Sequence, residues 1–149
     1  MSTQSNIQRR AVIRLAAVAA GGFTVIAAFQ LALAAGAPMG SAALGGLHPG
    51  RLPSELRVVS ALAAAFWLLA ALTALSRGGI GRSPIPYSFS RRGMWALTAL
   101  LAVGTVMNAA SSSRWERFGW APLVLGLTLV CLQLARSEDK ERLPEPGIR

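Results

Sequence analysis

Apolar residues are concentrated in four long runs, separated by segments rich in glycine, proline, serine and arginine. The runs cover residues 15–35, 58–76, 94–110 and 120–135, and they are 21, 19, 17 and 16 residues long. A helix needs about 17 to 25 mostly apolar residues to cross the ~30 Å hydrocarbon core of a bilayer, so the last two runs are short but sufficient. The pattern predicts an all-α integral membrane four-helix bundle, one domain over residues 1–136, with a short cytoplasmic tail over residues 137–149.

Small and aromatic residues within the runs predict how the helices pack. Small residues recur at every fourth position of the first run, which predicts a close-packing face: Ala16, Ala20, Thr24, Ala28, Ala32 and Gly36. Trp95, Trp115 and Trp120 lie at the ends of runs, where indole rings anchor helices in the headgroup layer. Trp67 lies near the middle of the second run and is expected to pack in the core rather than to contact a ligand.

The overall composition agrees with a membrane location. Of 149 residues, 53% are hydrophobic and only 14% are charged, which leaves too little polar surface for a soluble domain of this size. The net charge of +9 would suggest nucleic acid in a soluble protein. Here, however, the arginines flank the apolar runs, as Arg9, Arg10 and Arg14 do. We therefore expect the lipid bilayer, including anionic lipid headgroups, as a partner, and no nucleic acid.

The distribution of positive charge predicts the orientation. One set of flanking segments carries 11 Lys and Arg residues, and the opposite set carries 4. Because positively charged segments resist translocation, the richer side is expected to be cytoplasmic. This predicts a multi-pass protein of the cell membrane with both termini in the cytoplasm.

The N-terminal segment has two interpretations. Arg9 and Arg10, followed by an alanine-rich apolar run that ends near Gly36, are similar to a twin-arginine export signal. The run of 21 residues, however, exceeds the roughly 7 to 15 residues of a signal-peptide core, and three further spans follow it. We expect an uncleaved anchor, and the cleaved form remains the alternative.

Several kinds of membrane chemistry lack the side chains that they require. The four runs contain no Asp, Glu, His, Lys or Arg, whereas proton-coupled antiport of the small four-helix multidrug type uses a carboxylate at membrane depth. Thiol exchange of the vitamin K epoxide reductase type needs paired cysteines, and the chain has only Cys131. His48 is the only histidine, which is too few for a usual metal site. We predict a protein that is not an enzyme, with no catalytic residues, cofactor or metal.

Polar residues gather instead in the two loops expected on the outer face. Residues 36–57 are dense in glycine and proline, which predicts turns rather than a continuous helix. Together with the serine-rich loop before the fourth run, they supply a candidate binding site for an anionic headgroup or small solute: Asn108, Ser111, Ser113, Glu116, Arg117, Arg51 and Arg57. Near lipid, an unpaired charge is costly, so Glu116 is expected to form an ion pair with one of these arginines. The competing interpretation is a purely structural tie between the loops.

Short motifs in these loops carry a family resemblance. The first loop contributes Gly36, Pro38, Gly40, Gly45, Gly46, Pro49, Gly50, Leu52, Pro53 and Arg57, and the third loop contributes Asn108, Ser111, Ser113, Glu116, Arg117, Trp120 and Pro122. In this order they resemble an uncharacterised group of small four-span bacterial integral membrane proteins, from residue 36 to about residue 135. The resemblance implies four spans and no particular activity.

Two functional hypotheses follow from these observations. The first is a non-enzymatic accessory or binding subunit with a polar site on its outer face, which acts with a membrane protein partner or as a homo-oligomer. The second is a transporter or channel for a small neutral or anionic solute, with a pathway lined by Thr24, Gln30, Thr105 and Asn108. Four spans are few for a pathway, so the second hypothesis requires an oligomer.

Overall fold

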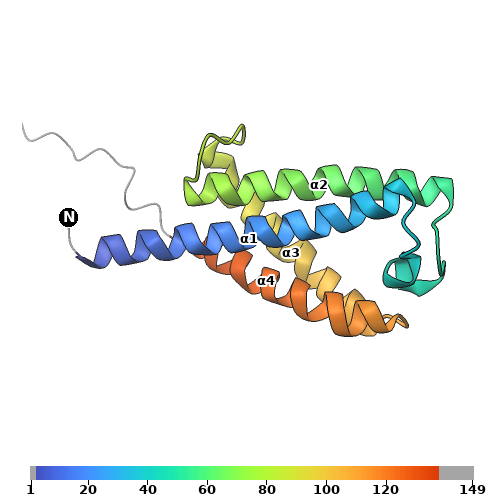
Figure 1. Cartoon of the computed structure of the whole chain (residues 1–149). Coiled ribbons are helices and arrows are strands. Elements are labelled where there is room, and N and C mark those ends of the chain that lie inside the picture. Colours follow the sequence, from blue (N-terminus) through green and yellow to red (C-terminus); the bar gives the residue numbers. More distant parts are fainter. Residues whose placement is uncertain (1–2, 138–149) are drawn as a thin grey trace, which may run out of the picture.

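The computed structural model describes residues 3–137, and this part of the chain is helical without any strand. Its long helices are α1 (Thr3–Ala35), α2 (Ser54–Gly78), α3 (Tyr87–Ala110) and α4 (Ala121–Arg136), with the short turns η1 (Gly40–Ala42), η2 (Leu44–Gly46) and η3 (Glu116–Trp120) in the loops (Figure 1). The predicted all-α fold with four helices is confirmed. The predicted tail lies, from residue 138 onward, outside the described residues.

Each candidate membrane span is longer than the apolar run that predicted it. The segments long and apolar enough to cross a membrane are Asn6–Ala35, Ser54–Gly78, Tyr87–Ala110 and Glu116–Arg136. The fourth run reaches 21 residues because η3, a π-helical turn, leads directly into α4. At about 1.5 Å per residue, 21 helical residues span about 30 Å, which is the thickness of the hydrocarbon core. The turn therefore supplies the length that the short apolar run lacks.

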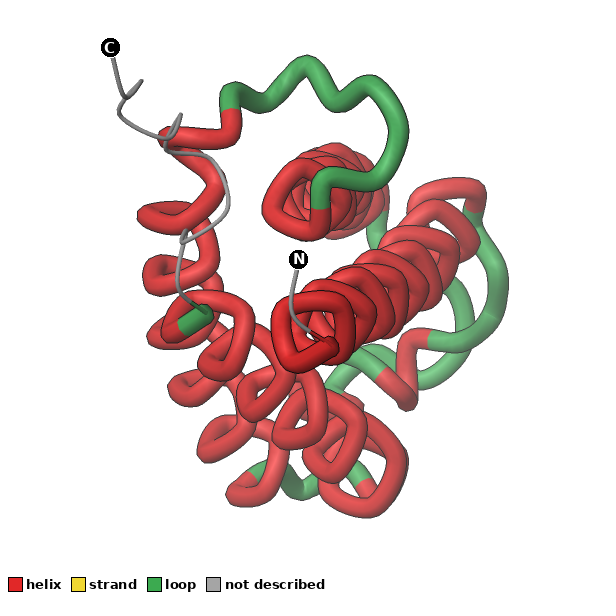
Figure 2. Tube along the Cα trace, turned by 90° about the vertical axis from the view of Figure 1, so that its left-hand side faces the viewer, coloured by secondary structure: helices red, strands yellow, loops and turns green. Residues whose placement is uncertain are grey.

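The helices form two antiparallel hairpins, α1 with α2 and α3 with α4. Figure 1 shows α1 and α2 lying side by side, with the second hairpin crossing them obliquely, and Figure 2 shows the same arrangement from one end. Side chains from all four helices form the core, including Phe23, Ala74, Met94 and Leu134, which are fully buried. Trp67 stacks on Phe23, with ring centroids 5.6 Å apart, as expected of a packing residue.

The predicted stripe of small residues is correct only at the start of α1. Ala16 and Ala20 are buried, but Thr24 and Ala28 are exposed. At 3.6 residues per turn, positions four residues apart advance by about 40° around the helix axis. A strict four-residue repeat therefore turns away from a neighbouring helix, and the buried face moves to Phe23 instead.

The two helices of the first hairpin approach closely at Gly78. A Cβ atom on Gly78 would lie 2.4 Å from the Cβ of Ala16, which has no other rotamer to adopt. We expect Gly78→Ala to destabilise the protein by about 1–3 kcal/mol, the usual cost of overpacking. The measurement is thermal unfolding in mild detergent, and Ala16→Gly in the same background should restore much of the loss.

Gly21→Ala is the matched control for this prediction. A Cβ there would meet no atom within 4 Å, so this variant should be neutral or slightly stabilised because alanine favours the helix. Equal losses at the two positions would show that the contact between Gly78 and Ala16 is not close.

Candidate functional site

The two loops predicted to face outward fold onto each other at one end of the bundle. We call this region the loop cap and define it as residues 36–53 and 111–120. The first of these loops turns on itself, and the Gly40 N–H donates to the Gly50 carbonyl at 2.9 Å. Beneath it, Leu33, Ala43 and Leu52 form a small buried cluster. The loop is thus anchored to the ends of α1 and α2, as a series of ordered turns.

Four hydrogen bonds join the second loop to the backbone of the first. The Gly45 N–H donates to Glu116 Oε1 at 3.0 Å, and the Ser112 hydroxyl donates to the Gly45 carbonyl at 2.9 Å. The Ser113 hydroxyl donates to the Ser41 carbonyl at 2.7 Å, and Trp120 Nε1 donates to the Ala42 carbonyl at 3.0 Å. Side chains of one hairpin therefore satisfy backbone groups of the other. The loops form one unit.

The local backbone explains why side chains must supply these bonds. Gly45 and Gly46 both have φ of 73°, a left-handed conformation that glycine adopts readily. Such turns leave backbone groups without helical or sheet partners, and a buried unpaired group is costly. A Cβ on Gly46 would also lie 3.2 Å from the Cβ of Ser113. Glycine at this position thus permits both the turn and the close approach of the second loop.

The predicted ion pair of Glu116 is wrong. Within residues 3–137, its carboxylate accepts a hydrogen bond from Gly45 and forms no ion pair with Arg51, Arg57 or Arg117. Glu116 is only 8% exposed, so its position in the cap is interior. A backbone N–H meets the need of this carboxylate for a hydrogen-bond donor, and no arginine is required.

Two of the three arginines, Arg57 and Arg117, instead donate to carbonyl groups at helix ends, and Arg51 lies over Gly36 just after α1. Arg57 Nε donates to the Ala34 carbonyl at 2.9 Å, and Arg51 packs so closely over Gly36 that a Cβ there would meet its guanidinium. Arg117 Nη2 donates to the Ser111 carbonyl, just beyond the end of α3, at 2.7 Å. Cations at these positions complement the negative ends of the helix dipoles.

The structure brings together only part of the candidate site. Ser111, Ser113, Glu116 and Arg117 lie in the cap, and the Ser111 hydroxyl accepts a hydrogen bond from the Ser113 N–H at 3.0 Å. Asn108 lies within α3 and donates to the Gly104 carbonyl of its own helix at 2.8 Å. Its Nδ2 group is therefore bonded within α3, and among the described residues no hydrogen bond joins the Asn108 side chain to the cap.

Sequence reasoning missed two residues of the cap, Ser112 and Trp120. Trp120, which the sequence predicts as an anchor in the headgroup layer, packs against Phe29, with ring centroids 4.6 Å apart, and donates a hydrogen bond to the first loop. The sequence feature that points to these residues is the Gly45-Gly46 pair, because the backbone groups of such a turn need hydrogen bonds from side chains. The pair does not show which side chains form those bonds.

The outer surface of the cap is apolar and aromatic, with arginine beside it. Leu47, Trp115 and Phe118 are 76%, 67% and 73% exposed, and Arg114 is also exposed. Four side chains of the second loop bond inward to the first: Ser112, Ser113, Glu116 and Trp120. What the cap presents outward is thus a set of large hydrophobic side chains, with the exposed polar side chains His48, Arg51 and Arg117 beside them.

The hydroxyl groups proposed for a solute pathway are used within their own helices. Thr24 donates to the Ala20 carbonyl and Thr105 to the Leu101 carbonyl, each at 2.8 Å. Thr24 is moreover exposed on the outside of α1. The Thr105 hydroxyl also lies 3.4 Å from the Thr128 hydroxyl of α4, so it contacts the neighbouring helix.

A second polar cluster, at the opposite end of the bundle, is centred on Arg77 of α2. Its side chain is 2% exposed. Nε donates to the Leu134 carbonyl at 3.0 Å, Nη1 donates to the Tyr87 hydroxyl at 2.6 Å, and Nη2 donates to both the carbonyl and the hydroxyl of Ser137. The guanidinium also lies 5.2 Å from the centre of the Tyr87 ring. Arg77 therefore joins α2 and α3 to the carbonyl end of α4.

No family model, curated protein or solved structure matches the chain. The resemblance to a bacterial four-span group therefore stays a prediction from short motifs. Among residues 3–137, no three His, Cys, Asp or Glu side chains are grouped to hold a metal ion.

The bond between Gly45 and Glu116 can be tested with two substitutions. Glu116→Gln keeps an oxygen acceptor, so we expect a stability close to that of the native protein, within about 1 kcal/mol. Glu116→Ala leaves the Gly45 N–H without its partner and should cost about 1–3 kcal/mol in thermal unfolding. Glu55→Gln, at an exposed carboxylate, is the control. If Gln and Ala at position 116 destabilised equally, the charge rather than the acceptor would be the stabilising feature.

Proposed function

We propose that this chain is a non-catalytic, multi-pass protein of the cell membrane that acts as an accessory or binding subunit through its loop cap. The observation that carries the proposal is the buried bond from Gly45 to Glu116, because it commits the polar groups of the cap to holding one surface in place. The polar residues of the candidate site then support the binding surface from below, and the large exposed side chains contact the partner.

The chemistry of the surface supports a protein partner in the membrane. Aromatic residues and arginine dominate the energetics of many interfaces, since they bury a large area with few rotatable bonds. Trp115, Phe118 and Arg114 are of these types and are exposed on a rigid loop. The proposed partner is the outer part of another membrane protein or of a second copy, with anionic headgroups around the rim.

The proposed orientation places the cap outside the cell and both termini in the cytoplasm. It is supported by the distribution of Lys and Arg along the sequence, with 11 in the flanking segments predicted to be cytoplasmic and 4 in those predicted to face outward. The apolar length of each helix supports a transmembrane position. We favour a binding subunit over an oligomeric transporter because the hydroxyls of Thr24 and Thr105 already have partners. Thr24 donates to the Ala20 carbonyl, and Thr105 donates to the Leu101 carbonyl and contacts the Thr128 hydroxyl.

Photocrosslinking in native membranes tests this proposal. A photoreactive residue at Leu47 or Phe118 should give one discrete protein adduct, whereas the same residue at Phe89, exposed near the start of α3, should not. Glu116→Ala should reduce the adduct at Leu47 several-fold, because the surface loses its support. Adducts to lipid alone from the cap, or the same protein adducts from Phe89, would contradict a partner at the cap.

A further inference from the structure

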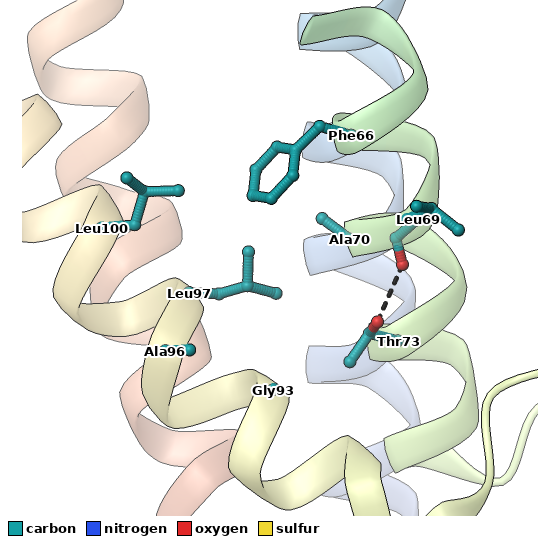
Figure 3. Close-up of a pocket in the computed structure, with 8 residues that line it drawn as sticks. All are labelled: Phe66, Leu69, Ala70, Thr73, Gly93, Ala96, Leu97 and Leu100. Atoms are coloured by element: carbon teal, nitrogen blue, oxygen red, sulfur yellow. Dashed lines mark hydrogen bonds between the residues drawn. The ribbon is translucent and has the colours of Figure 1, made fainter. Parts of the chain in front are cut away.

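A groove between α2 and α3 lies apart from the loop cap. It has a volume of about 370 Å³ and is lined by apolar and small side chains of the two helices, among them Phe66, Ala70, Thr73, Gly93, Leu97 and Leu100. Figure 3 shows Phe66, Leu97 and Leu100 projecting into the space between the helices. The groove arises because α1 pairs with α2 and α3 pairs with α4, which leaves α2 and α3 less closely packed.

The lining excludes a polar ligand. The hydroxyl of Thr73 is its one side-chain polar group, and this hydroxyl donates to the Leu69 carbonyl of the same helix at 2.8 Å (Figure 3). A polar molecule entering the groove would lose its hydration without gaining hydrogen bonds. An occupant must therefore be hydrocarbon.

The shape of the groove favours a single hydrocarbon chain over a helix. At the end near Gly93 the helices approach closely, since a Cβ there would lie 2.8 Å from the Thr73 side chain. A helix has a fixed diameter of about 10 Å and cannot follow a groove that narrows in this way. A flexible acyl chain can.

The charge at that end determines which acyl-bearing molecule fits. Arg92 lies one turn before Ala96, a lining residue, and therefore on the same side of α3. Arg82 is in the loop between the helices, and the Ser83 hydroxyl holds this loop to the Leu72 carbonyl, beside Thr73, at 3.1 Å. Both arginines are exposed. Arg91 is not included with them, because its guanidinium group is directed to α4, where its Nε donates to the Ala135 carbonyl.

We propose that the groove binds one acyl chain of an anionic glycerophospholipid, with the lipid phosphate held by Arg92 and Arg82. The apolar lining takes the chain, and the two exposed guanidinium groups recognise the negative headgroup. This inference rests on the proposed membrane location, but not on the loop cap or on any partner there. It holds for either orientation of the protein, since the groove and its arginines are at the same end.

Native mass spectrometry of the full-length protein in mild detergent tests the proposal. The probes are phosphatidylglycerol and phosphatidylcholine with identical acyl chains. We expect one phosphatidylglycerol to be retained in preference to phosphatidylcholine. Each of Arg82→Gln and Arg92→Gln should weaken phosphatidylglycerol binding by about fivefold and leave phosphatidylcholine binding unchanged. Arg114→Gln, at the cap, is the charge control.

Filling the groove tests the position of the acyl chain. Ala96→Phe should reduce the retention of both lipids, whereas Ala99→Phe, at an exposed position of α3 outside the lining, should not. The thermal stabilisation by added phosphatidylglycerol should fall in parallel. The proposal is overturned if the native protein retains both lipids equally, or if the two phenylalanine variants behave alike. A dimer that Ala96→Phe alone disrupts would assign the groove to a second copy instead and would also overturn it.

Discussion

The hydrogen bond from the Gly45 N–H to the buried carboxylate of Glu116 joins the two hairpins of this bundle at one end. The need for this bond follows from the backbone at Gly45 and Gly46, which are both left-handed. The Gly46 N–H donates to the nearby Ala43 carbonyl, whereas the Gly45 N–H has its acceptor in the other hairpin. Near a lipid phase such groups are costly to leave unpaired. A side chain from the other hairpin supplies the acceptor, and the positions of both loops follow from it.

The opposite end is organised by the same kind of contact. Arg77 donates to the Leu134 carbonyl and to the backbone of Ser137, so a side chain of the first hairpin again satisfies backbone groups of the second. Next to Arg77, at this same end, small residues allow close packing within the first hairpin, as Gly78 and Ala16 show. Helices α2 and α3, which belong to different hairpins, remain apart along part of their length. The groove is the result of that pairing.

Hydrophobic patterning predicted the four helices and the turn-rich first loop, because apolar runs and glycine-proline clusters are properties of residue type. It did not predict the partner of Glu116, since a backbone amide has no signature in the sequence and the arginines nearby suggested an ion pair. In the sequence, Arg77 is one of several arginines that flank the apolar runs. Its burial depends on the carbonyl groups at the end of α4, whose position relative to Arg77 the sequence does not show. The length of the fourth span depended on a π-helical turn at Glu116–Trp120, which begins in a polar segment.

The most direct test of this account is the hydrogen exchange of the Gly45 amide, followed by NMR in detergent micelles. Because the Gly45 N–H is hydrogen-bonded to Glu116, its amide proton should exchange slowly in the native protein. In Glu116→Ala the exchange should be faster by about tenfold or more, given the usual worth of a bond to a charged acceptor, while the amide of Ala64, inside α2, stays protected. An unprotected Gly45 amide in the native protein, or one that Glu116→Ala leaves unchanged, would contradict the central role of this bond.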